Sequence, residues 1–168
     1  MKADRKTVGQ LFSSELQYIV PLFQRPYSWE KKQWEALWND ITELIDEAES
    51  KPEHFLGPLV TQELKNDAEV RQYLLIDGQQ RLTTLSIILI ALRERLKEFG
   101  ANEERDSLLK RIERYCSNDI GGRFNYKIIP TVTFDDRDNY IALVQKTTPP
   151  REGSQLVQAF NYFLREIR

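Results

Sequence analysis

The sequence predicts an α/β protein of the α+β type, in which a small sheet packs against helices. The first observation is an apolar, β-rich run, Val70–Ile76, which stops at Asp77-Gly78 and gives way to an unbroken helical run, Leu82–Phe99. The second is the preceding run Phe55–Leu64, which we expect to form a hairpin with Val70–Ile76. The third is the helical periodicity that begins at Trp29 and continues to about residue 49.

The junction between the strand and the helix has the composition of an anion site. Backbone N–H groups in the first turn of a helix have no partner within the helix and converge on one point. Gly78 lacks a Cβ, so a ligand can approach the backbone closely there. Arg81 is a cation in the first turn, where it opposes the helix dipole at a cost of about 0.3–1 kcal/mol when solvated. We therefore expect an anion in front of Arg81, and phosphate fits best.

A stiff segment, Pro21–Tyr27, precedes the first long helix. Its two prolines hold Val20 and Arg25 in extended conformations. A rigid segment can present the amide of Gln24 and the planar guanidinium of Arg25 to a pocket at fixed positions. The alternative is that Arg25 pairs with a helix carboxylate.

The first half of the chain contains further local signals. Thr7 can cap a short helix over Val8–Phe12, and Gln17–Val20 is typical of a strand. Ser28 is a good N-cap for the helix that begins at Trp29.

One apolar stripe of that helix is expected to face the core. Its members are Trp34, Leu37, Trp38, Ile41, Leu44, Ile45 and Ala48. Two tryptophans could stack on bases, but their position in phase with leucine and isoleucine favours packing. Tyr27 and Trp29 lie off the stripe and beside Arg25, so they are better candidates to line a base pocket.

Burial is expected for the helix that follows Arg81. It is apolar nearly all round from Leu82 to Leu92 and becomes charged over Arg93–Glu98. Asn102 then caps another helix that runs through Tyr115. Within the first hairpin strand, Gly57-Pro58 interrupts the β-rich run and implies an edge position or a bulge.

The last third of the chain completes a first domain, residues 1–145. It contributes a strand over Tyr126–Val132 and a helix over Asp135–Val144. Residues 146–168 are expected to be a linker and the start of a truncated C-terminal helical region. The reason is that the amphipathic run Leu156–Ile167 has no obvious partner within a domain that is already complete.

Composition limits the classes of function. The formal charge of -2 and the isoelectric point near 5.6 give no global attraction to nucleic acid, so DNA contacts need a local patch. Cys116 is the single cysteine and His54 the single histidine, which excludes an internal disulfide, a cysteine zinc cluster and a His-Asn-His nuclease site. No secretory leader or membrane-length apolar run is visible, and the protein is expected to be cytoplasmic.

Three motifs carry a resemblance to a known family. Val20–Trp29, His54–Gly57 and Ile76–Leu85 occur in this order, and Arg137–Tyr140 continues the match over most of the chain. Together they resemble the N-terminal domain of GmrS/GmrD-type modification-dependent restriction proteins. That family is similar to the ParB/sulfiredoxin superfamily, whose members carry a Gly-x-x-Arg turn at a nucleotide phosphate site. The resemblance implies a ParB/sulfiredoxin-like small mixed sheet packed with helices.

The resemblance also implies a function. The family uses this domain to bind and hydrolyse nucleoside triphosphates, coupled to modified or foreign DNA, while a separate C-terminal nuclease domain cuts. The chain is therefore expected to be a regulatory, NTP-hydrolysing domain of a phage-defence restriction protein, with nucleotide, Mg²⁺, DNA and the nuclease domain or a partner subunit as its partners. No Walker-type Gly-x-x-x-x-Gly-Lys loop is present.

The expected site combines the DGQQR turn (Asp77–Arg81) with the FQRPY segment (Phe23–Tyr27). The residues predicted to bind nucleotide or phosphate are Gln24, Arg25, Tyr27, Gly57, Gly78, Arg81, Thr83 and Thr84. The residues predicted to act in catalysis are Asp77, Gln79 and Gln80. Arg81 and Arg25 would neutralise phosphates, and the two glutamines would orient oxygens or a water.

Asp77 needs an explanation, because a carboxylate beside phosphates is repulsive. It could hold Mg²⁺, which binds through one or two carboxylates plus substrate phosphates, or it could polarise water. It could equally be a helix N-cap or a turn residue.

Two other functions remain open. The domain could be a non-enzymatic module that binds a nucleotide or a DNA phosphate as a switch for a separate nuclease domain. A nuclease acting from this domain itself would require a carboxylate metal cluster, and the sequence offers no convincing one.

Overall fold

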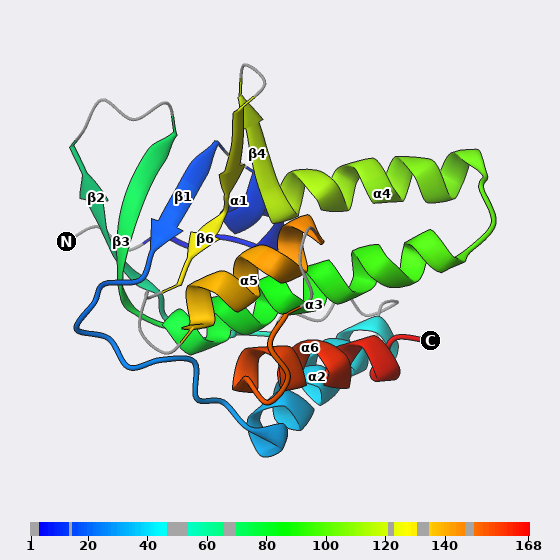
Figure 1. Cartoon of the computed structure of the whole chain (residues 1–168), viewed down its shortest axis with the longest axis horizontal. Coiled ribbons are helices and arrows are strands. Elements are labelled where there is room, and N and C mark those ends of the chain that lie inside the picture. Colours follow the sequence, from blue (N-terminus) through cyan, green and yellow to red (C-terminus); the bar gives the residue numbers. More distant parts are fainter. Residues whose placement is uncertain are drawn as a thin grey trace.

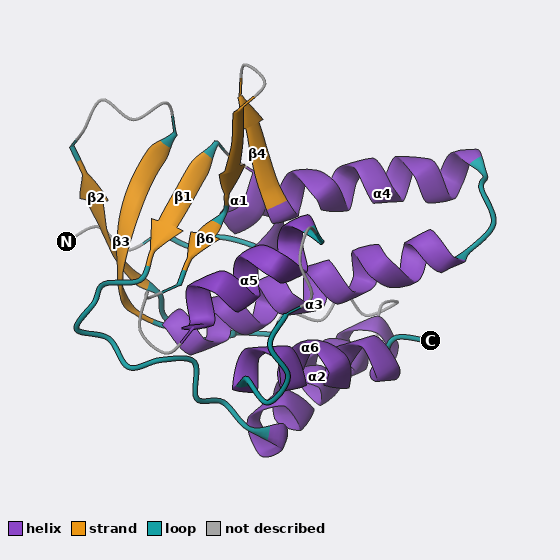
Figure 2. Ribbon diagram, viewed as in Figure 1, coloured by secondary structure: helices purple, strands orange, loops and turns teal. Residues whose placement is uncertain are grey.

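A four-stranded sheet lies on one side of the molecule, and the long helix α3 crosses beside it with helices on both flanks (Figures 1 and 2). The computed structural model describes residues 4–13, 15–46, 54–65, 70–120, 123–130, 135–146 and 150–168. The elements are α1 (Val8–Ser13), β1 (Leu16–Ile19), α2 (Lys31–Asp46), β2 (Val60–Leu64), β3 (Arg71–Asp77), α3 (Gln79–Glu98), α4 (Glu103–Cys116), β4 (Ser117–Ile120), β5 (Arg123–Tyr126), β6 (Ile128–Ile129), α5 (Asp136–Gln145) and α6 (Gln155–Glu166).

The larger sheet is mixed, with strand order β2-β3-β1-β6. β1 runs parallel to both β3 and β6, and β2 pairs antiparallel with β3 as the predicted hairpin. The prediction of an α+β fold with a small mixed sheet is therefore confirmed. The first hairpin strand begins at Val60, later than the expected Phe55, because the chain around Gly57 has left the sheet.

The predicted strand Tyr126–Val132 is wrong as a single element. The chain bends at Lys127, so that β5 pairs with β4 in a separate two-stranded sheet while β6 joins β1. Lys127 is buried at this bend, its ammonium donates to Asn118, and burial lowers its pKa to about 8. Residues 131–132 of the predicted strand lie outside the described residues.

Helix α3 is buried along most of its length, as its apolar composition predicts. Leu82, Ile87, Ile90 and Ala91 are fully inaccessible to solvent. The helix contacts α4 on one side and α6 on the other, and all three belong to one hydrophobic core. This packing fixes the end of α3 that carries the DGQQR turn.

The apolar face of α6 has a partner, contrary to expectation. The Trp34 and Tyr162 rings lie 5.7 Å apart, and the Trp38 and Phe163 rings 5.9 Å apart, so the tryptophans of α2 pack on α6. Packing in the core is thereby confirmed for both tryptophans. Ile45 of the predicted stripe is instead 67% exposed, and Ala48 lies outside the described residues. A further helical region beyond α6 stays a prediction.

Two predicted helix caps are confirmed. The hydroxyl of Thr7 accepts from the Gln10 N–H at 3.2 Å, and the side chain of Asn102 accepts from the Arg105 N–H at 2.8 Å. Helix α2 begins at Lys31 and not at Trp29, while α3 begins at Gln79, earlier than the predicted Leu82.

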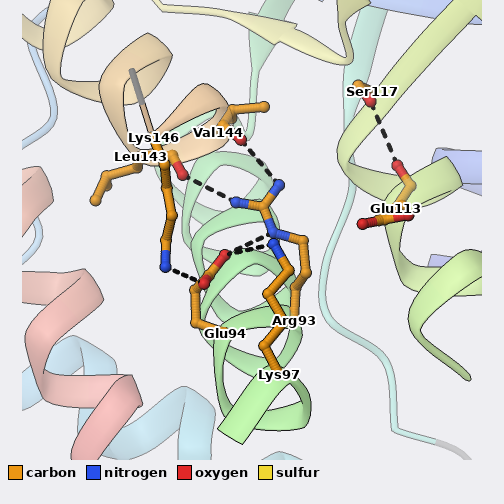
Figure 3. A network of polar contacts seen from close by, with 8 residues as sticks. All are labelled: Arg93, Glu94, Lys97, Glu113, Ser117, Leu143, Val144 and Lys146. Atoms are coloured by element: carbon orange, nitrogen blue, oxygen red, sulfur yellow. Dashed lines mark hydrogen bonds and ion pairs between the residues drawn. The ribbon is translucent and has the colours of Figure 1, made fainter. Parts of the chain in front are cut away.

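A buried ionic network, missed by the sequence analysis, links the far half of α3 to the end of α5 (Figure 3). The Arg93 guanidinium donates to the carbonyl oxygens of Val144 at 2.9 Å and Leu143 at 3.1 Å, and to Glu94 at 2.8 Å. Lys146 also bonds to Glu94. Burial alone would raise the pKa of Glu94, but these cations outweigh it and hold the pKa below its ordinary value.

We expect Glu94→Gln to lower the free energy of unfolding by about 1–3 kcal/mol at neutral pH, because hydrogen bonds to a charged group are lost. Because the pKa of Glu94 is lower in the folded protein, its ionised form stabilises the fold at pH values above the ordinary pKa of 4.5. This stabilisation is lost as the pH falls through the pKa of the folded state. The wild type and the variant should therefore converge on acidification in urea titrations. Glu98→Gln, an exposed residue paired with Arg95, is the matched control and should change little. An equal loss in both variants would contradict the assignment.

Candidate functional site

The start of α3 has two sides with different roles. On one side its first side chains bind the backbone of the FQRPY segment. On the other side, Arg81 borders a cavity between α2 and the loop 54–59, which precedes β2. The predicted site residues divide between these two sides.

Gln80 binds the backbone at two points, the proline of the FQRPY segment and the serine that follows the segment. Its amide nitrogen donates to the carbonyl of Pro26 at 2.9 Å, and its amide oxygen accepts from the Ser28 N–H at 2.8 Å. The Gln80 side chain is buried, and both bonds are partly shielded from water. Gln80 therefore closes the segment onto α3.

Gln79 and Gln24 continue this arrangement. Gln79 donates to the Arg25 carbonyl at 3.0 Å and to the Gln24 side-chain oxygen at 3.1 Å, and Gln24 donates to the Ile76 carbonyl at 2.7 Å. The catalytic roles predicted for Gln79 and Gln80 stay predictions, and they would require these bonds to be exchanged for contacts with a ligand or water.

Tyr27 is a buried anchor of the same segment. Its hydroxyl accepts from the Trp34 indole N–H at 2.9 Å and lies 2.7 Å from the Thr84 hydroxyl, which donates to the Gln80 carbonyl. Burial raises the pKa of Tyr27 above its ordinary value. The ligand-binding roles predicted for Tyr27 and Thr84 stay predictions, since both hydroxyls already have protein partners.

Asp136, at the start of α5, was missed by the sequence analysis. Its carboxylate accepts from the Tyr27 N–H at 2.6 Å, across 109 residues of sequence. Burial raises the pKa of Asp136, while the Tyr27 bond opposes that rise. Asp136, Thr83 and both glutamines line a small cavity of about 10 Å³. The neighbouring motif Arg137–Tyr140 was the only signal in the sequence near this carboxylate.

Arg81 lies between the loop 54–59 and the cavity. Its guanidinium donates to the Pro58 carbonyl at 3.2 Å, and a Cβ on Gly57 would come within 2.8 Å of its Nη1 atom. Gly57 has φ of +94°, so a side chain at this position would be strained as well as crowded. The two predicted residues are thus in contact, and a larger residue at 57 would displace the guanidinium.

The cavity beside Arg81 has a volume of about 280 Å³. Its wall combines aromatic, amide and charged groups. They belong to Trp29, Gln33, Ala36, Leu37, Asp40, His54, Phe55, Leu56 and Arg81. Among the described residues, no carboxylate forms an ion pair with Arg81, although Asp40 pairs with His54 at 3.2 Å. A cation without a carboxylate partner therefore faces a mixed polar and aromatic cavity.

The missing Cβ of Gly78 lets the protein's own loop 54–59 pack closely against the backbone there. It adopts φ of +89° as the N-cap of α3, and a Cβ there would come within 2.3 Å of the Leu59 side chain. The sequence predicted that a ligand would approach at this point. Leu59 covers the backbone at Gly78, and the phosphate-binding role predicted for Gly78 stays a prediction.

Asp77 and Arg25 are exposed side chains at the edge of the site. The Asp77 carboxylate accepts from the Gly78 N–H at 2.8 Å, as a turn residue does, and Gly78 rather than Asp77 is the N-cap. The described residues contain no cluster of three acidic, histidine or cysteine side chains that could hold a metal. A single exposed carboxylate still fits Mg²⁺ that is bound mainly by substrate phosphates and water.

These features define a small α+β domain in which a strand–turn–helix junction holds an extended segment on one side and borders an arginine-lined cavity on the other. The chain belongs to the GmrSD restriction endonuclease N-terminal domain family, whose family model matches residues 8–167. The predicted resemblance is thereby confirmed, and it assigns the domain a role in restriction. No curated protein matches the chain. None of the described helices is long and apolar enough to span a membrane.

We expect Gln80→Ala to destabilise the protein by about 1–3 kcal/mol, because the Pro26 carbonyl and the Ser28 N–H lose their partner. Hydrogen exchange of the Ser28 amide should accelerate in the variant. Gln62→Ala, an exposed glutamine on β2, is the matched control and should leave both quantities nearly unchanged. Unaltered exchange at Ser28 in Gln80→Ala would refute the structural role.

Proposed function

We propose that this chain is a nucleoside-triphosphate-binding regulatory domain of a restriction protein. The observation that carries the proposal is the state of Arg81, a half-buried guanidinium whose hydrogen bond within the described residues goes to a neutral carbonyl. Since no carboxylate neutralises it there, and since it borders a cavity of about 280 Å³, a bound anion is its natural partner.

Phosphate fits this position better than a carboxylate ligand. A planar guanidinium presents several N–H donors in a fork, and phosphate accepts two of them at once. Arg25 is exposed, while its backbone is fixed by the bond from Gln79, so its side chain is available to a second phosphate group. Arg25 does not line the cavity beside Arg81, so it would serve only a part of the phosphate chain that extends out of that cavity.

The aromatic part of the cavity supports a nucleotide over an inorganic phosphate. Trp29 and Phe55 line the same cavity as Arg81. Base stacking on an aromatic side chain contributes about 1–3 kcal/mol per base. A ligand with an aromatic base and a phosphate chain would use both kinds of group.

Hydrolysis is the further step of the proposal. Mg²⁺ at Asp77 would neutralise phosphate charge and orient a water, while Gln79 or Gln80 would orient oxygens. Through the full-length protein, this reaction would be coupled to DNA sensing and to cleavage by a C-terminal nuclease domain or partner subunit in the cytoplasm.

A second candidate is a nucleotide switch without hydrolysis. It is favoured by the hydrogen bonds that occupy both glutamine amides. If these bonds persist when the nucleotide is bound, binding alone would switch the nuclease domain, and dissociation of the nucleotide would return it to its first state.

Arg81→Ala should abolish nucleotide binding, because the ligand loses its main phosphate partner. Isothermal titration calorimetry with each nucleoside triphosphate and Mg²⁺ measures this, and we expect affinity to fall at least about 100-fold, as for loss of a charged hydrogen-bond pair. Arg71→Ala, an exposed arginine on β3, is the matched control and should bind normally. Circular dichroism should show a folded Arg81→Ala protein, and retention of affinity would refute the proposal.

Phosphate release distinguishes the two candidates. The hydrolytic form predicts steady release from a triphosphate with Mg²⁺, lost in Asp77→Asn while nucleotide binding persists. The switch form predicts thermal stabilisation by the triphosphate with no release by wild type or variant. Asp138→Asn, an exposed carboxylate on α5, serves as the control for a general charge effect.

A further inference from the structure

We propose that the cavity beside Arg81 binds a guanine base, with Asp40 as the residue that recognises it. This inference rests on the proposed nucleotide-binding function and adds the identity of the base. It follows from the donors and acceptors that α2 and the loop 54–59 present to the cavity.

Asp40 supplies a carboxylate held in place from one side. The His54 Nε2 atom lies 3.2 Å from Asp40 Oδ2, while Oδ1 has no partner among the described residues. The side chain is partly exposed and lines the cavity, so Oδ1 is available to a ligand. The cavity therefore presents a carboxylate acceptor that has one contact from the protein, at Oδ2.

A carboxylate is selective among the bases because its two oxygens accept from two adjacent donors. On its Watson–Crick edge, guanine presents the N1–H and the N2 amino group side by side. Adenine and cytosine each present one donor next to an acceptor, and uracil presents one donor between two acceptors. In each of these three bases an acceptor atom would lie against the negative charge of Asp40, which is unfavourable. Guanine is therefore the base that fits.

The remaining wall suits the rest of a nucleoside. Gln33 lies two turns before Asp40 on the same face of α2, about 10 Å along the helix, which is too far to share one base edge but suits a ribose. Its amide oxygen already accepts from the Glu30 N–H at 3.0 Å, which leaves the amide nitrogen as a donor. Trp29 and Phe55 line the same cavity and could stack on the base, and Arg81 could bind the phosphates.

Titration calorimetry of the 168-residue chain with Mg²⁺ and GTP, ATP, ITP, XTP or inorganic triphosphate tests the inference. GTP should bind at least tenfold more tightly than ATP or XTP, and ITP should bind more weakly than GTP because it lacks the amino group. Asp40→Asn should reverse the preference toward XTP, since an amide can donate to the second carbonyl of xanthine. Glu43→Gln makes the same change of charge at an exposed position of α2 and should keep the preference for GTP.

The outcomes separate this inference from the proposed function. Equal affinity for GTP, ATP and inorganic triphosphate, abolished in Arg81→Ala, would overturn the guanine assignment and leave the phosphate site standing. An unchanged preference in Asp40→Asn would also overturn it. Absence of binding to any triphosphate would overturn the proposed function and this inference together.

Discussion

The rest of the site depends on the hydrogen bonds that join the first turn of α3 to the extended segment before α2. Buried amides must find partners, and Gln79 and Gln80 find them in main-chain groups of residues 25–28. A segment with two prolines cannot complete its own backbone pairing within a sheet or a helix, so it needs such donors and acceptors from elsewhere. The glutamine amides and the main-chain groups of the segment therefore satisfy each other's hydrogen bonds, which fixes the segment against the start of α3.

This constraint explains why the DGQQR turn contains both neutral and charged side chains. The glutamines face inward, where a charge would be costly to bury, and amides can both donate and accept. Arg81 follows them on the next part of the turn and reaches the loop 54–59, where Gly57 leaves space for a flat guanidinium. Gly78 in turn leaves space for Leu59. The two glycines thus position one loop against the helix, and the cavity lies where that loop meets α2.

The sequence predicted those parts that depend on neighbouring residues. Periodicity and turn chemistry identified the β2–β3 hairpin, the buried α3 and the caps at Thr7 and Asn102, because these are local properties. Contacts between distant segments were not predicted. The bond from Tyr27 to Asp136 crosses 109 residues, and the packing of α6 on α2 depends on how the chain folds back. For the site, the sequence placed Gly57 near Arg81, as the structure does, but could not show that the glutamine amides were occupied.

Helix α3 and the loop 54–59 differ in how tightly they are held. Toward its C-terminus, Arg93 and Glu94 are buried and tied to the end of α5, and the helix between is packed on α4 and α6. Moving this helix would break many contacts at once, so the energy of ligand binding is not expected to shift it. Among the described residues, the loop 54–59 is held by the Arg81 bond to the Pro58 carbonyl and by the exposed pair of His54 with Asp40. Contacts of a glycine and a leucine add to these bonds. An anion that competed for the guanidinium would therefore act first on this loop, which continues directly into the exposed edge strand β2.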